Sequence, residues 1–165
     1  NKHSKPVIAM IDGIATAAGC QLISSCDLAY SSENSQFATP GVNIGLFCST
    51  PMVPLSRTVG KKQAMEMLLT GDLIDAKKAL SIGLINNVFE TEKLEENVLK
   101  IANKIASKSS ATIKIGKDAF YKQKDMSLKE AYDYTSKIMT ENMLHKDSEE
   151  GITAFLEKRS PNWKD

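Results

Sequence analysis

A continuous apolar run at residues 7–11 is followed by Asp12 and Gly13, and then by small residues as far as Gly19. A strand that is apolar on both faces is typical of a parallel sheet covered on both sides. The small residues allow a tight turn, after which a helix begins. The pattern predicts a buried strand, a turn and a helix whose first backbone N–H groups have no intrahelical partner.

Two further short strands are expected at residues 27–30 and 36–39, the second ended by Pro40 and Gly41. A strand, a helix and a strand at this spacing predict a right-handed crossover in an α/β sheet. Another strand is expected at residues 84–89. Before it, Asp75 is placed to cap a short helix that ends ahead of Gly83.

The second half of the sequence carries helical patterns. One face of an amphipathic helix is formed by Leu94, Val98, Ile101 and Ile105. Ser127 with Glu130, and Asp147 with Glu150, fit capping boxes that start two more helices. We therefore expect one domain over residues 1–165, with an α/β part at 1–90 and a helical part at 91–165. Three or four strands are few for so many helices, so we expect further strands upstream of Asn1.

Composition excludes several classes of function. The 165 residues have a net charge of +1, which gives no bulk attraction to nucleic acid or to an acidic membrane. There is no apolar run long enough to span a membrane and no signal-peptide pattern. The three cysteines lack metal-ligand spacing, which favours free thiols in a reducing compartment and predicts no metal site.

Two of the cysteines are candidate nucleophiles. Cys20 would lie in the first turn of a helix, where the pKa of a thiol can be lowered. Neither Cys20 nor Cys48 has a recognisable histidine partner, since His3 lies near the start and His145 lies in the helical half. Buried, inert cysteines are therefore the favoured interpretation.

Two turns are candidates for chemistry. The N–H groups around Ala18 and Gly19 would lie at a helix N-terminus, which favours negative charge, although small residues also serve tight helix–strand packing. In the second turn, Leu46 and Phe47 are an apolar pair that either lines a pocket or fills the core. Ser49 or Thr50 could cap the following helix, with Pro51 in its first turn.

Several motifs together resemble the enoyl-CoA hydratase/isomerase (crotonase) superfamily, closest to its enoyl-CoA hydratase domain-containing subgroup. They are residues 5–13, Ala18-Gly19-Cys20-Gln21-Leu22, Cys26-Asp27, Phe37-Ala38-Thr39-Pro40-Gly41, Gly45, residues 64–71, 76–79 and 83–84, and the closing stretch 150–159. The resemblance covers essentially the whole chain. It implies a crotonase-like α/β fold of spiral ββα repeats, incomplete at the N-terminus, with a C-terminal helical trimerisation region.

The resemblance also implies the ligand and the site. Family members bind acyl-CoA thioesters, and two backbone N–H groups form an oxyanion hole for the thioester enolate. One of these maps onto Ala18, and the other belongs to a loop upstream of this chain. The substrate and CoA contacts are expected at Ile14, Ala17, Gly19, Pro40, Ile44, Leu46, Phe47 and Ser49, with Phe155 and Lys158 near the CoA adenine and phosphates. Phe155 in the core and Lys158 in solvent is the alternative interpretation.

The sequence departs from the family pattern at the two catalytic glutamates. The two glutamates that hydratases use map onto Gln21 and Gly41. A glutamine amide does not exchange a proton at neutral pH, and glycine has no side chain, so ordinary hydration should be nearly abolished. This leaves enolate chemistry such as decarboxylation, or alternatively a non-catalytic acyl-CoA-binding or assembly scaffold.

Further expectations follow from the resemblance. They are a coenzyme A thioester as substrate or ligand, no tightly bound cofactor, and assembly into homotrimers or hexamers. No nucleic-acid or membrane partner is expected. The location is expected to be intracellular, either the cytoplasm or the mitochondrial matrix.

Overall fold

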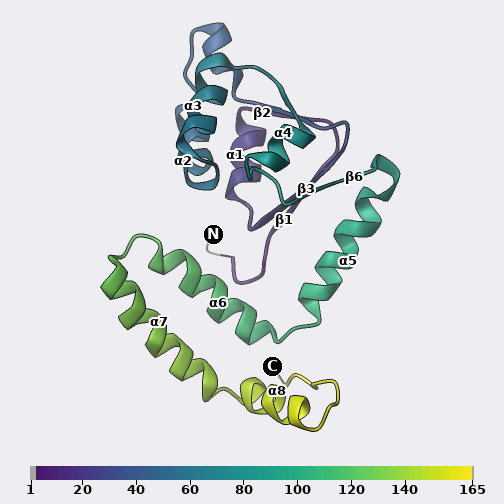
Figure 1. The fold of residues 1–165 in the computed structure, drawn as a ribbon, viewed down its shortest axis with the longest axis vertical. Helices are drawn as coiled ribbons and strands as arrows, with labels where there is room; N and C mark the ends of the chain where they lie inside the picture. Colours follow the sequence, from purple (N-terminus) through teal and green to yellow (C-terminus); the bar gives the residue numbers. More distant parts are fainter. Residues whose placement is uncertain (1–2, 165) are drawn as a thin grey trace. The chain divides into compact units, whose positions relative to one another are not determined.

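The computed structural model describes residues 3–164. Short strands and helices alternate as far as residue 89, and the chain beyond that residue is helical (Figure 1). The chain divides into two units. The sheet unit comprises Val7–Ala102, and the helical unit combines residues 3–6 with residues 103–164. An α/β part followed by a helical C-terminal part agrees with the fold class that the sequence predicted, although the two units do not divide at residues 90 and 91.

The sheet unit contains two small sheets. The strands are β1 (Ile8–Ile11), β2 (Ile14–Thr16), β3 (Leu28–Ser32), β4 (Gln36–Ala38), β5 (Ile74–Asp75) and β6 (Asn87–Phe89). One sheet has the order β1-β3-β6 and is parallel throughout. The other has the order β2-β4-β5, with β2 and β4 parallel and β5 antiparallel to β4. The sequence predicted β1, β3 and β4 to within two residues at each end. It missed β2 and β5, and extended β6 by three residues.

Helices cover these strands (Figure 1). They are α1 (Ala18–Ser25), η1 (Pro40–Ile44), α2 (Ser49–Thr58), α3 (Lys61–Thr70), α4 (Ala76–Ser81), η2 (Thr91–Lys93) and the first part of α5 (Leu94–Ala106). The core between the sheets and α1–α4 is centred on Phe37, Leu55 and Leu68, each at most 1% exposed. Asp75 caps α4 by accepting a hydrogen bond from the Lys78 N–H at 2.7 Å, as predicted.

A second cluster is formed where α5 packs on the parallel sheet. Leu94 and Val98 are buried against Tyr30, and Ile101 packs beside them. The predicted amphipathic face of this helix is therefore confirmed. Tyr30 and Phe89 lie with their ring centroids 6.0 Å apart and close that side of the cluster.

The helical unit contains the end of α5, then α6 (Ser110–Gln123), α7 (Leu128–Met143) and α8 (Lys146–Leu156). The predicted capping box of α7 is present, because Ser127 and Glu130 bond each other's backbone N–H groups. The box predicted at Asp147 is wrong. The helix α8 begins at Lys146, and the His145 ring caps it by accepting from the Asp147 N–H at 3.2 Å.

The C-terminal tail folds back on α8. The carboxylate of Asp147 accepts a hydrogen bond from the Lys164 N–H at 2.9 Å, and Asp147 is only 2% exposed. This long-range bond explains the failed prediction, because the carboxylate holds the tail instead of capping the helix. Among the residues that the structure describes, no helix is both long and apolar enough to cross a membrane.

Candidate active site

The turn between β2 and α1 is strained. Ala17 has φ 46° and ψ −107°, a conformation that residues with a side chain rarely adopt. Its N–H donates to the Ala38 carbonyl of β4 at 3.0 Å, and its carbonyl accepts the Gln21 N–H at 3.0 Å. Backbone strain of this kind costs about 1–3 kcal/mol and is found mostly at functional sites. The turn is therefore a candidate site on the backbone geometry alone.

The first amides of α1 follow this turn. Ala18 and Gly19 are the first two residues of the helix. The first intrahelical hydrogen bond runs from the Gln21 N–H to the Ala17 carbonyl. Helix geometry leaves the N–H groups of Ala18 and Gly19 without an intrahelical acceptor. Ala18 is exposed and Gly19 is half-buried, so a ligand can reach both. This arrangement suits an oxyanion.

Gln21 lies one turn further along the same helix. It is half-buried, and its backbone carbonyl accepts the Ser25 hydroxyl at 2.7 Å. Ile14, at the start of β2, is 68% exposed. The structure therefore brings Ala17, Ala18 and Gly19 together at one turn, with Gln21 on the helix that leaves it.

The second predicted turn begins at the end of β4, beside the first. Because β2 and β4 are parallel neighbours, with Thr16 opposite Ala38, both strands end at the same edge of the sheet. The 3-10 helix η1 starts at Pro40, and Gly45 ends it with φ 75°. The Leu46 N–H donates to the Gly41 carbonyl at 2.9 Å, which closes residues 41–46 into a ring.

Large apolar side chains of this loop are exposed. Ile44 is 76%, Leu46 is 63% and Phe47 is 42% exposed. The interpretation of Phe47 as a core residue is therefore wrong, and an apolar surface at this edge of the sheet takes its place. Ser49 is exposed and is the first residue of α2.

The start of α2 differs from prediction. Its N-cap is Cys48, and neither Ser49 nor Thr50 caps it. The Cys48 side chain does not cap the helix either, since its Sγ accepts a hydrogen bond from the Gly41 N–H at 3.3 Å. Pro51 does lie in the first turn, as expected.

The buried thiols are poor nucleophiles. Cys20 is 1% exposed and its thiol donates to the Ala15 carbonyl at 3.3 Å. Burial raises the pKa of Cys20 from 9.0 to about 11, and the nearby Cys48 adds a smaller rise. A helix start can lower the pKa of a thiol, but at Cys20 desolvation outweighs the lowering effect of a hydrogen bond with the Ala38 backbone. The interpretation as inert cysteines agrees with this result.

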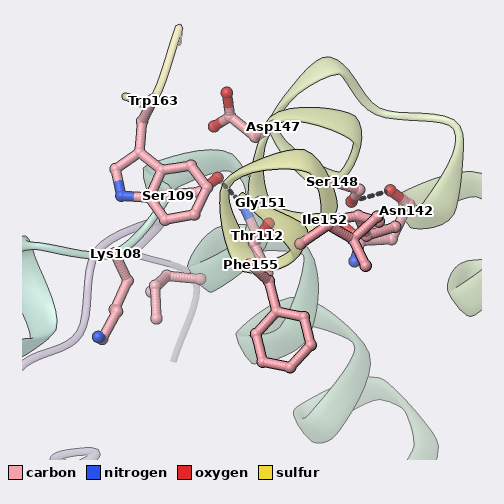
Figure 2. A pocket seen from close by; sticks show the side chains of 12 residues that line it. Lys108, Ser109, Thr112, Asn142, Asp147, Ser148, Gly151, Ile152, Phe155 and Trp163 are labelled. Carbon is pink, nitrogen blue, oxygen red and sulfur yellow. Dashed lines mark hydrogen bonds between the residues drawn. The ribbon is translucent and has the colours of Figure 1, made fainter. Parts of the chain in front are cut away.

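Phe155 and Lys158 lie at the end of α8, in the helical unit. Phe155 is 81% exposed, so its alternative placement in the core is wrong. Lys158 is exposed and adopts φ 54°, a left-handed conformation in which glycine is usual. Figure 2 shows Phe155 beside a cavity of about 530 Å³ that the helical unit forms between α6, α8 and Trp163.

The cavity is mostly apolar. Ile113, Ile152 and Leu156 line it with Phe155, and Lys108 lies at its rim. The indole N–H of Trp163 donates to the Ser107 carbonyl at 2.8 Å and holds the tail in place. No local sequence pattern indicates this cavity, because it is formed by residues from four separate segments.

Known proteins have similar sequences. This chain matches the enoyl-CoA hydratase/isomerase family over residues 1–165. The mitochondrial enoyl-CoA hydratase domain-containing protein 3 of Rattus norvegicus is 53% identical over 161 residues, which cover 98% of this chain and 54% of the relative. The mitochondrial enoyl-CoA hydratase of Pongo abelii is 40% identical over 162 residues, covering 98% and 56%. This chain therefore spans about half the length of these curated relatives.

Solved structures share the fold. The crystal structure of human enoyl coenzyme A hydratase domain-containing protein 3 matches with a TM-score of 0.95 and 54% identity, over 98% of this chain and 64% of that one. An enoyl-CoA hydratase from Mycobacterium smegmatis matches with a TM-score of 0.95 and 46% identity, over 97% and 62%. The predicted crotonase-like fold is confirmed.

Proposed function

Because the chain belongs to the enoyl-CoA hydratase/isomerase family, we propose that it binds acyl-CoA thioesters and stabilises a thioester enolate at the turn before α1. The single observation that carries this proposal is the strained turn at Ala17, which presents the Ala18 N–H at an exposed helix start. A preorganised N–H donor of this kind contributes about 10²–10³-fold to kcat in acyl-transfer sites.

The side chains at this site favour chemistry that needs little proton transfer. Gln21 carries an amide, and position 41 carries no side chain. General acid–base catalysis contributes about 10²–10⁴-fold, so hydration of a double bond should be slow here. Cleavage of a carbon–carbon bond next to the thioester needs no base. In decarboxylation of a malonyl-type thioester, the bonding electron pair moves to the carbonyl oxygen as CO₂ leaves, and the enolate is protonated afterwards.

Other parts of the proposal concern binding and assembly. The apolar surface at Ile44, Leu46 and Phe47 would contact the acyl or pantetheine chain, and Phe155 with Lys158 would meet the adenine and a phosphate. The thioester is substrate or ligand, and no tightly bound cofactor is involved. Homotrimers or hexamers are proposed. The mitochondrial matrix is the proposed location, because the two curated relatives named above are mitochondrial proteins.

A second candidate function is a non-catalytic acyl-CoA-binding or assembly scaffold. The observation that favours it is the geometry of Gly41, where a side chain would meet the Leu46 carbonyl oxygen at 2.7 Å. Because the loop has no space for a side chain at position 41, it cannot supply a catalytic acid from that position.

The two candidates are separated by experiments on the full-length protein. Titration calorimetry with a panel of acyl-CoA thioesters measures binding, and turnover is followed with crotonyl-CoA and with a malonyl-type thioester. We expect binding, with release of CO₂ and little hydration. Binding without turnover across the panel would favour the scaffold.

Matched variants test the role of Gln21. Gln21→Ala should leave hydration of crotonyl-CoA unchanged at its low level, as should Gln63→Ala, a half-buried glutamine on α3. Fast hydration that is lost in Gln21→Ala and kept in Gln63→Ala would overturn the proposal. Absence of both binding and turnover would overturn both candidate functions.

A further inference from the structure

Gly41 and Cys48 are joined across the loop that connects η1 to α2. The Gly41 N–H donates to the Cys48 Sγ at 3.3 Å, while the Gly41 carbonyl accepts the Leu46 N–H at 2.9 Å. Cys48 is 7% exposed and belongs to the main core, together with Cys20 from α1. Both backbone hydrogen-bonding groups of Gly41 are therefore used to close the loop.

Position 41 has no space for a side chain. A Cβ atom on Gly41 would lie 2.7 Å from the Leu46 carbonyl oxygen, 2.9 Å from the Cys48 Sγ and 3.3 Å from the Cys48 nitrogen. Gly45, four residues on, has φ 75° and nothing near its missing side chain. Gly45 meets a conformational need, whereas Gly41 has no positive φ and is required because sulfur and main chain fill the space.

The Cys48 side chain does not cap the helix that begins after it. Cys48 is the N-cap of α2, where a polar side chain normally accepts an N–H of the first helical turn. Its carbonyl accepts the Met52 N–H at 2.9 Å, but its Sγ serves Gly41 instead. The thiol thus belongs to the loop rather than to the helix.

We propose that Cys48 is a positioning residue, whose thiol holds the Gly41 amide and fills the space where a side chain on residue 41 would begin. The wall of the site beside the α1 turn then consists of main chain and sulfur, and it accepts a carboxylate at residue 41 only if the loop moves. This rests on the proposed function in one respect, namely that the acyl-CoA enters at this edge of the sheet. The substrates are then thioesters that react without proton transfer at this wall.

Thermal melting of the full-length protein tests the packing. Gly41→Ala should lower the melting temperature by about 3 °C or more, because the new Cβ meets the Sγ and the Leu46 oxygen. The loss should be smaller when Gly41→Ala is made in a Cys48→Ala background. Gly116→Ala is the matched control, since nothing lies near a Cβ at that site, and its effect should not depend on Cys48. An equal loss from Gly41→Ala in both backgrounds would overturn the proposal.

Hydrogen–deuterium exchange tests the hydrogen bond. In Cys48→Ala the Gly41 amide should exchange at least about tenfold faster than in the native protein. Cys48→Ser should restore most of the protection, because its hydroxyl can also accept the N–H. A purely structural role for the side-chain volume would give Ser and Ala the same exchange rate. That result, or unchanged exchange in Cys48→Ala, would contradict the assignment.

A gain-of-function experiment tests the consequence for chemistry. Gln21→Glu with Gly41→Glu should hydrate crotonyl-CoA no faster than Gln21→Glu alone. A gain of about tenfold or more would show that the wall accepts the second acid, and would overturn the proposal. The melting and exchange measurements use no ligand, so failure of acyl-CoA binding would reject the proposed function while leaving the role of Cys48 intact.

Discussion

The backbone N–H of Ala17 donates to the Ala38 carbonyl at 3.0 Å, and this bond fixes the turn before α1 to the end of β4. Ala38 is 1% exposed and Phe37 is fully buried, so the acceptor is held by the core of the sheet unit. The strained conformation of Ala17 is therefore held by the sheet, which places the first amides of α1 beside the loop from Pro40.

Replacement of Ala17 should separate stability from binding. Ala17→Gly should raise the free energy of unfolding by about 1 kcal/mol, because glycine tolerates the positive φ. Ala17→Val should lower it, because a β-branched side chain fits this conformation worst. Chemical denaturation measures both. If Ala17→Gly is destabilising, the turn is not strained as described. Acyl-CoA affinity should fall in the glycine variant, whose turn is freer.

Cys20 should resist alkylation. With its pKa raised from 9.0 to about 11 by burial, the thiolate fraction near neutral pH is about 100-fold below that of an ordinary thiol. Iodoacetamide labelling followed by mass spectrometry should modify Cys20 at least about 100-fold more slowly in the native protein than in urea. Rapid native labelling of Cys20 at pH 7 would contradict the buried placement.

The tail beyond α8 should loosen in acid. The hydrogen bonds from the Arg159 guanidinium and the Asn162 N–H lower the pKa of Glu150 from 4.5 to about 2. A carboxyl group whose pKa is lowered by folding stabilises the folded state. This stabilisation is complete above pH 4.5 and is lost as the pH falls toward 2. Thermal melts of the native protein and of Glu150→Gln should therefore differ at pH 7 and converge between pH 4.5 and 2. A constant difference would exclude this ion pair as the cause.

The capping box of α7 should contribute measurably. Ser127→Ala removes the side chain that accepts the Glu130 N–H, and it should cost about 1 kcal/mol of stability. The pKa of Glu130, lowered by its bonds to Ser127, should rise toward its usual value in the variant. Ser136→Ala, an exposed change within the same helix, is the control for denaturation. Equal effects of the two variants would argue against the cap.

The sequence predicted the elements that depend on local pattern. The run at residues 7–11 marked β1, the spacing of Leu94 and Val98 marked α5, and Ser127 with Glu130 marked the start of α7. The strand β2 was missed because its three residues, Ile14–Thr16, lie among small turn residues and form no apolar run.

Hydrogen bonds between residues that are separated in the sequence could not be predicted from local sequence patterns. The bond between Cys48 and Gly41 spans seven residues, and the one between Asp147 and Lys164 spans 17. Nothing in the local sequence says that a thiol at an N-cap will turn back to a loop. The turn pattern indicated the N–H groups around Ala18, and the family resemblance assigned Ala18 its oxyanion role, but the strain at Ala17 is visible only in the backbone angles.

The left-handed lysine at the end of α8 implies a compromise between two demands. A glycine at position 158 would adopt φ 54° without strain, and a lysine there costs about 1 kcal/mol. Lys158→Gly should therefore raise stability in denaturation experiments while weakening CoA binding in calorimetry, since the cation is removed. Opposite signs in the two measurements would show a fold that gives up some stability to keep a positive charge at a fixed point.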